Sequence, residues 1–126
     1  MSRVWISWIL IIFSALLDSY AAFVVKMKFN ELGPMDFSSF SGFLHYMGAF
    51  VRSPLLVTGV LAFATAPALW FLALNRLELS VGYPALVGCH LLFIMIFGLY
   101  FLGEPVTANK LIGASLVMVS FYFLNR

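Results

Sequence analysis

Long runs of apolar residues alternate with shorter polar connections along the chain. The runs cover residues 4–25, 54–74, 81–102 and 108–124. None of them alternates apolar and polar positions as the strands of a membrane barrel do, so each run indicates a helix. Because an α-helix rises about 1.5 Å per residue, about 20 residues cross the roughly 30 Å hydrocarbon core of a bilayer. The pattern predicts an all-α integral membrane protein in which residues 1–126 form one bundle of four transmembrane helices, the fourth near the minimum length.

The connection between the first and second runs has a pattern of its own. Between residues 37 and 51, apolar side chains recur at helical spacing and polar side chains fall on the opposite face. This segment predicts a short amphipathic helix that lies in the membrane interface. An extension of the second spanning helix into the headgroups fits equally well, because periodicity does not fix how a helix is oriented.

The last connection contains residues that are typical of helix ends. Gly103 suits the C-cap of the third helix, where a left-handed backbone is favoured. Thr107 suits the N-cap of the fourth helix, because its hydroxyl can accept a bond from a free backbone N–H. We therefore expect a compact turn between these helices.

The first run has to be distinguished from a cleaved signal peptide. Arg3 and the apolar residues after it resemble the basic and apolar regions of such a peptide. The apolar stretch continues to Val25 with no convincing small-residue cleavage site, so we expect a retained helix.

The composition agrees with a chain that lies in lipid. Hydrophobic residues make up 63% of the 126 residues and charged residues 10%, whereas soluble domains average roughly 45–50% and 25%. A small soluble fold cannot cover its surface with so few polar side chains, so the lipid bilayer is the expected partner. The net charge of +2 comes without a basic cluster, which argues against nucleic acid.

The positive charges do not favour one orientation. Four spanning helices put both termini on one side of the membrane. By sequence, Arg3, Arg76 and Arg126 belong to the terminal side, and Lys26, Lys28, Arg52 and Lys110 to the other. The positive-inside rule needs a clear excess, which is missing here. Either the chain inserts both ways and forms antiparallel dimers, or a partner or a weak local bias fixes its direction.

Asp18 is the outstanding polar residue, because it lies well inside the first apolar run. A carboxyl at this depth costs roughly 2.5–3.5 kcal/mol on insertion scales. The low dielectric favours its neutral form, so the group is suited to bind and release a proton or to recognise a cation. The alternative is a structural carboxyl that is hydrogen-bonded to neighbouring side chains.

Two further residues are candidates for substrate or proton binding. His90 lies near the middle of the third run and is suited to a proton relay, although a neutral imidazole bonded to a hydroxyl or carbonyl is the common alternative. Lys26 follows Asp18 by eight residues and either snorkels to the membrane surface or reaches toward a phosphate.

The sequence lacks the patterns expected of an enzyme. It has no glycine-rich phosphate loop, no metal-ligand spacing and no nucleophile elbow. We expect no catalytic residues, no metal site and no cofactor.

Small residues in the fourth run suggest an association surface. Gly113 and Ser120 are seven residues apart and therefore lie on one helix face. Small side chains let membrane helices approach closely, so we expect these two residues at a dimer interface, with packing inside the monomer as the alternative. Dimerisation would supply eight helices, which is closer to the number that transport folds use.

The second half of the chain resembles a known superfamily. The resemblance is carried by Leu77–Leu86, by the Gly-Glu-Pro turn within Phe101–Thr107 and by Lys110–Val117. These segments are similar to the C-terminal half of EamA-like proteins in the drug/metabolite transporter superfamily. The four-helix members closest in size are the small multidrug resistance transporters and the subunits that flip undecaprenyl-phosphate aminoarabinose.

The resemblance implies roles for individual residues. Asp18 falls where the small multidrug resistance transporters carry an essential glutamate, and Lys26 falls on the lysine that ends the same helix. Tyr83 falls on a substrate-facing tyrosine, and Gly113 on the small residue of the dimerising helix. Aspartate in place of glutamate, Leu86 in place of a tryptophan and the long first connection argue against export of polyaromatic drug cations. The Ser-Val-Gly-Tyr-Pro pattern and the Gly-Glu-Pro turn are more similar to the flippase subunits and to general EamA-like proteins.

Three functional hypotheses follow. The first is a secondary transporter for a small organic or amphiphilic solute, proton-coupled through Asp18, in the bacterial inner membrane. The second is a flippase subunit for a lipid-linked sugar or another phospholipid-like substrate. The third is a structural membrane subunit that transports nothing. The expected partner is a second copy of the chain or a paralogous four-helix subunit.

Overall fold

The computed structural model describes residues 2–35, 37–124 and 126, and side chains from Val4 onward, so the charge of Arg3 counted above lies outside its described side chains. All regular structure in these residues is helical. The elements are α1 (Ser2–Leu32), α2 (Phe40–Val51), α3 (Pro54–Leu74), α4 (Leu79–Ile96), the π-helical segment η1 (Phe97–Phe101) and α5 (Ala108–Leu124).

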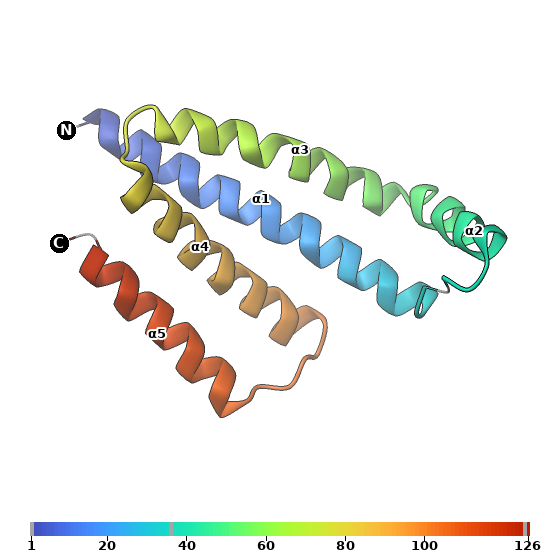
Figure 1. Cartoon of the computed structure of the whole chain (residues 1–126). Helices are drawn as coiled ribbons and strands as arrows, with labels where there is room; N and C mark the ends of the chain where they lie inside the picture. The colour runs from blue at the N-terminus through green and yellow to red at the C-terminus, as the bar shows by residue number, and fades with distance from the viewer. Residues whose placement is uncertain (1, 36, 125) are drawn as a thin grey trace.

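The long helices lie side by side in the order α3, α1, α4, α5 (Figure 1). α1 is the central helix, and it contains fully buried residues such as Ile11, Ala15 and Val24. α1, α3, and α4 together with η1, are long and apolar enough to cross a membrane, and α5 is a shorter apolar helix. The structure is therefore an all-helical membrane bundle, while spanning by α5 stays a prediction.

Small residues bring α1 and α3 into close contact. A Cβ atom added at Gly59 of α3 would lie 3.2 Å from the Val24 side chain of α1. The hydroxyl of Ser14 on α1 donates to the backbone oxygen of Ala66 on α3 over 2.7 Å. Close backbone approach and hydrogen bonds of this kind replace the hydrophobic effect, which does not drive helices together within lipid.

α1 continues beyond the apolar run that predicted it. The extra residues are polar, but helical backbone bonds do not depend on side-chain polarity, and Lys28 pairs with Glu31 one turn away. The helix ends at Leu32, where Gly33 has φ +78° and its N–H donates to Phe29 O over 3.0 Å. A glycine in the left-handed region is the usual helix terminator.

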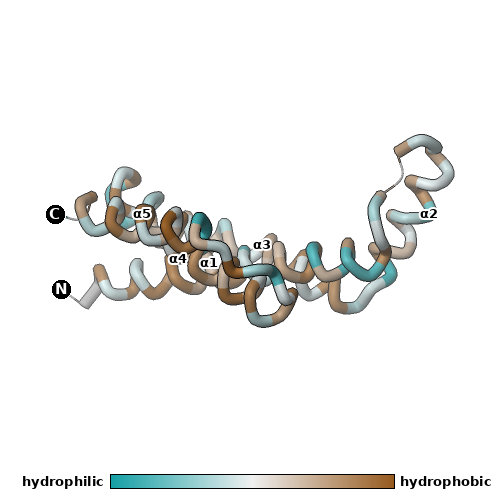
Figure 2. Tube along the Cα trace, turned by 90° about the horizontal axis from the view of Figure 1, so that it is seen from below, coloured by the Kyte–Doolittle hydropathy of each residue, from teal (hydrophilic) through white to brown (hydrophobic). Residues whose placement is uncertain are grey.

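α2 is a helix distinct from α3 rather than an extension of it. The Ser39 side chain caps its start by accepting from the Gly42 N–H, and Ser53 begins α3 in an extended conformation. Tyr46 donates its hydroxyl to Gly33 O over 2.9 Å, which ties α2 to the end of α1. Figure 2 shows α2 turned away from α3 at the end of the molecule opposite both termini. Its position in the membrane interface stays a prediction.

The third predicted helix is α4 followed by η1. In η1 the Leu102 N–H donates to Phe97 O over 3.2 Å, a wider turn than that of an α-helix. Gly103 then has φ +64°, and Thr107 Oγ1 accepts from the Lys110 N–H over 3.3 Å. Thr107 is thus confirmed as an N-cap, whereas the C-cap is Leu102 and Gly103 is the left-handed residue directly after it.

Candidate functional site

Asp18 and His90, predicted separately from the sequence, meet where α1 packs on α4. Asp18 Oδ2 lies 3.3 Å from His90 Nδ1, and the two groups form an ion pair when the imidazole is protonated. Ser19 Oγ lies 3.1 Å from the same nitrogen. Ser19 is fully buried, so the hydroxyl is a fixed neighbour of the imidazole.

The hydrogen bonds around Ser19 determine what His90 can do. The hydroxyl has one proton, and its shortest acceptor is Ala15 O at 2.7 Å, compared with 3.3 Å for His90 O. The Ser19 oxygen is then free to accept from Nδ1–H, and Asp18 Oδ2 lies close to the same hydrogen. If Asp18 is protonated instead, the carboxyl can donate to a bare Nδ1. One proton can therefore reside either on Asp18 Oδ2 or on His90 Nδ1.

The carboxyl opens onto a cavity of about 410 Å³. The Asp18 side chain keeps 43% of its surface exposed in the single chain, although it lies well inside the first apolar run. A charged or polar group at this depth normally faces protein or a water-filled cavity rather than lipid. The cavity is lined by Asp18, Ala21, Ala22 and Val25 of α1, Gly59, Val60 and Phe63 of α3, and His90 of α4.

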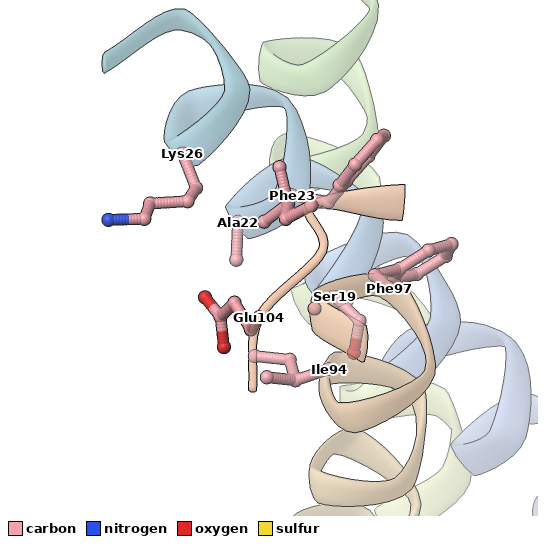
Figure 3. A pocket seen from close by; sticks show the side chains of 9 residues that line it. Ser19, Ala22, Phe23, Lys26, Ile94, Phe97 and Glu104 are labelled. Carbon is pink, nitrogen blue, oxygen red and sulfur yellow. The ribbon is translucent and has the colours of Figure 1, made fainter. Parts of the chain in front are cut away.

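A second pocket, of about 180 Å³, lies farther along α1 between this helix and the end of α4. Lys26 lines this pocket, and Ala22 borders both cavities. Asp18, Ala22 and Lys26 follow one another at intervals of four residues, so they share a face of α1. Figure 3 shows Lys26 and Glu104 on the same side of the pocket, with Phe97 across from them.

Glu104 is a site residue that sequence reasoning missed. Its backbone N–H donates to Gly98 O over 3.0 Å, which folds the turn back over η1. A Cβ atom at Gly98 would lie 3.0 Å from Glu104 Oε2, so the carboxylate rests against a bare glycine. Lys110 Nζ lies 3.5 Å from the same oxygen. In the sequence, Glu104 is a carboxylate in a turn next to a predicted spanning helix. A carboxylate in such a turn is usually exposed to solvent, so the sequence did not identify it as a site residue.

The other residues predicted for the site lie apart from these two cavities. Tyr83 sits in the first turns of α4, packed edge-on against Trp70 with their ring centres 6.2 Å apart. Gly113 and Ser120 are exposed on α5, and Gly113 has open space where a side chain would begin. Within the described part of the chain, no three His, Cys, Asp or Glu residues gather as metal ligands would.

Several proteins are similar to this chain. A protein of Sinorhizobium fredii strain NGR234, named only as uncharacterized protein y4nH, is 40% identical over 74 residues, which are 59% of this chain and 63% of that protein. A probable 4-amino-4-deoxy-L-arabinose-phosphoundecaprenol flippase subunit, ArnF of Enterobacter sp. strain 638, is 32% identical over 109 residues, or 84% of each chain. The ArnE subunit of the same name in Pseudomonas syringae pv. syringae is 34% identical over 58 residues, 46% of this chain and 53% of its own length.

The similarity is confined to sequence relatives. No family model matches the chain. No solved structure matches it either. The match to ArnF reaches across most of both chains, whereas the chain spans less than two thirds of the rhizobial protein.

Proposed function

Because this chain belongs to the family of small drug/metabolite transporter proteins that includes the ArnE and ArnF flippase subunits, we propose that it is a flippase subunit for an amphiphilic substrate with a charged headgroup. It is a multi-pass protein of the inner membrane. The names of its relatives, which describe a sugar linked to a lipid through phosphate, support this substrate class.

The observation that carries the proposal is the pairing of Asp18 with His90 beside an open cavity. Two groups that can each hold a proton lie 3.3 Å apart in the middle of the bundle. Ionisable groups are costly to place in the membrane, so they usually mark sites that a proton or a ligand uses. We assign Asp18 and His90 as the proton-binding site and the 410 Å³ cavity as part of the substrate path.

The proposed mechanism couples the charge of Asp18 to the ligand. With its proton, Asp18 is neutral and the cavity favours apolar contents. Without it, the carboxylate attracts a cationic group of the substrate, so proton and substrate compete for one site. Transport then follows when the site binds protons on one side of the membrane and substrate on the other.

A second subunit completes the site in this proposal. An exposed carboxyl inside the bilayer is unstable against lipid, so another helical surface must cover this face of α1. We propose that this partner is a second copy of the chain or a paralogous four-helix subunit, and the word subunit in the relatives' names supports the second form.

A proton-coupled exporter of small organic solutes is the second candidate. The Asp18 cavity falls within the size range of roughly 300–1,000 Å³ that is usual for small-molecule sites. The two candidates differ in whether lipid-like or soluble molecules are moved.

Reconstitution into liposomes tests the proposal. The chain is assayed with a fluorescently labelled polyprenyl phosphate that carries an amine on its headgroup, so that the probe has the cationic group the mechanism requires. Its movement to the outer leaflet is read by quenching under an imposed pH gradient. We expect Asp18→Asn to reduce the gradient-dependent rate about tenfold or more, since an amide cannot exchange the proton. Glu78→Gln, which removes an exposed carboxyl in a short connection, should leave the rate unchanged.

Three outcomes of this assay would contradict the proposal. Equal rates for the native chain and Asp18→Asn would remove this carboxyl from the mechanism. Equal rates together with a more stable variant would favour a structural subunit. Movement of soluble organic cations but of no labelled lipid would favour the exporter.

A further inference from the structure

The pocket between Lys26 and Glu104 has features that the proton site does not use. The two side chains come from different elements, Lys26 from α1 and Glu104 from the turn after η1. They carry opposite charges and line the same pocket, but among the described ion pairs none joins them. The remaining walls are mostly apolar: Ala22, Phe23, Ile94, Phe97, Gly98 and Leu102, with Ser19 at the base.

The depth of the pocket differs from that of Asp18. Lys26 follows Asp18 by eight residues, which is about 12 Å along a helix. It also marks the end of the apolar run of α1. The pocket therefore opens where hydrocarbon gives way to lipid headgroups, so a bound amphiphile could place its polar end here and its chains along the apolar wall.

The backbone around Gly98 positions the carboxylate of Glu104 at the pocket, because the Glu104 N–H donates to Gly98 O. The wide turn of η1 places Gly98 under it, and the missing side chain of Gly98 leaves room for Oε2. π-Helical segments are frequent at functional sites. Lys110 reaches the same oxygen at 3.5 Å but also donates to Pro105 O at 3.1 Å, so Glu104 does not hold it exclusively.

We propose that this pocket binds a headgroup that carries an anionic phosphate and a cationic amine together. Lys26 receives the phosphate through charge-assisted hydrogen bonds, and Glu104 receives the amine. Two separated opposite charges in one pocket are complemented best by a ligand with the reverse arrangement of charges. The inference rests on the proposed function, because it names the headgroup that a flippase of this kind would recognise. A resident bilayer phospholipid offers the same chemistry.

The test measures binding to the whole purified chain in a neutral detergent. The probes are phosphatidylethanolamine, which has both charges, phosphatidic acid, which has the phosphate alone, and phosphoethanolamine, which has no lipid chains. We expect Lys26→Gln to weaken binding of both lipids about fivefold, the effect of one partly exposed charged contact. Lys28→Gln is the matched control, because Lys28 lies on the same turn but pairs with Glu31.

Glu104 is tested by the ratio of the two affinities. In Glu104→Gln we expect the preference for phosphatidylethanolamine over phosphatidic acid to fall about fivefold, because only the amine loses its partner. Gly98→Ala should act in the same direction, since a Cβ would displace the carboxylate without removing it. Gly88→Ala is the control, because a Cβ there meets no atom within 4 Å.

Several outcomes would overturn the inference. Identical binding by the Lys26→Gln and Lys28→Gln variants would reduce Lys26 to a surface lysine, and an unchanged ratio in Glu104→Gln would remove Glu104 from the site. Tight binding of chain-free phosphoethanolamine would point to a soluble ligand instead of an amphiphile.

The same variants separate this inference from the proposed function. If phosphatidylethanolamine binds the pocket but the labelled amine-bearing polyprenyl phosphate is not moved in liposomes, the pocket holds a resident lipid and the flippase proposal fails alone. If movement of that amine-bearing probe depends on Asp18 but not on Lys26 or Glu104, the pocket inference fails alone.

Discussion

At the scale of residues, the chemistry of this protein is concentrated in a few polar side chains near α1. His90 Nδ1 lies 3.3 Å from Asp18 Oδ2 and 3.1 Å from Ser19 Oγ, so both oxygens can hydrogen-bond to the same nitrogen. A proton relay needs such neighbouring sites, whereas a purely structural histidine needs only one partner. The buried Ser19 restricts the imidazole, so we expect His90 to affect proton movement more than substrate affinity.

The chain offers a matched test of this role. His90→Gln keeps a hydrogen-bonding side chain but cannot carry the extra proton, so gradient-driven transport in liposomes should fall roughly tenfold or more. Substrate binding in detergent should change little. His45→Gln alters the other histidine, which is exposed on α2, and should leave both measurements unchanged. A loss of binding equal to the loss of transport would contradict the relay role.

At the scale of elements, small residues decide which helices pack tightly. α1 and α3 meet over Gly59, Ala62 and Ala66, all of which are buried. α5, in contrast, has no buried residue among those described, and it packs mainly against α4. Its Phe121 also makes an edge-on ring contact with Trp8 of α1. We infer that α1 and α3 form the rigid part of the chain and that α5 is held more loosely.

A glycine substitution measures the tight contact. Gly59→Ala would place a Cβ atom 3.2 Å from Val24, so the two helices must separate slightly, and we expect a loss of about 1 kcal/mol in unfolding free energy. Titration with a denaturing detergent provides the measurement. Gly88→Ala serves as the comparison: its site is open, so helix propensity should leave stability equal or higher. A Gly59→Ala variant as stable as the native chain would show that α1 and α3 adjust freely.

At the scale of the whole molecule, two surfaces of the chain bear on the proposed partner subunit. Asp18 needs cover inside the bilayer, and the open face of α5 carries Gly113 and Ser120. We propose that α5 forms the seam between two subunits and that Asp18 faces the space between them. Small residues at such a seam permit close helix contact.

Crosslinking in native membranes tests the seam. Single cysteines at Gly113 or Ser120, in a chain with Cys89→Ser, should form disulfide-linked pairs on mild oxidation. Leu61→Cys, on an exposed position of α3, is the control and should give none. A product of twice the chain mass indicates a homodimer, and another mass indicates a paralogous partner. Crosslinking through Leu61→Cys but not through the cysteines on α5 would contradict the α5 seam and place the subunit interface on α3.

The sequence by itself determined the helical class, the membrane setting and most helix ends. Apolar runs report the lipid contact of each helix directly, and cap residues such as Gly103 and Thr107 act through bonds to nearby backbone atoms. Only the tertiary structure decided which polar groups meet. Asp18 reaches His90, and Glu104 reaches the pocket of Lys26, because helices distant in sequence pack at particular depths and rotations. Hydrophobic periodicity carries no information about those rotations when nearly every face of a helix is apolar.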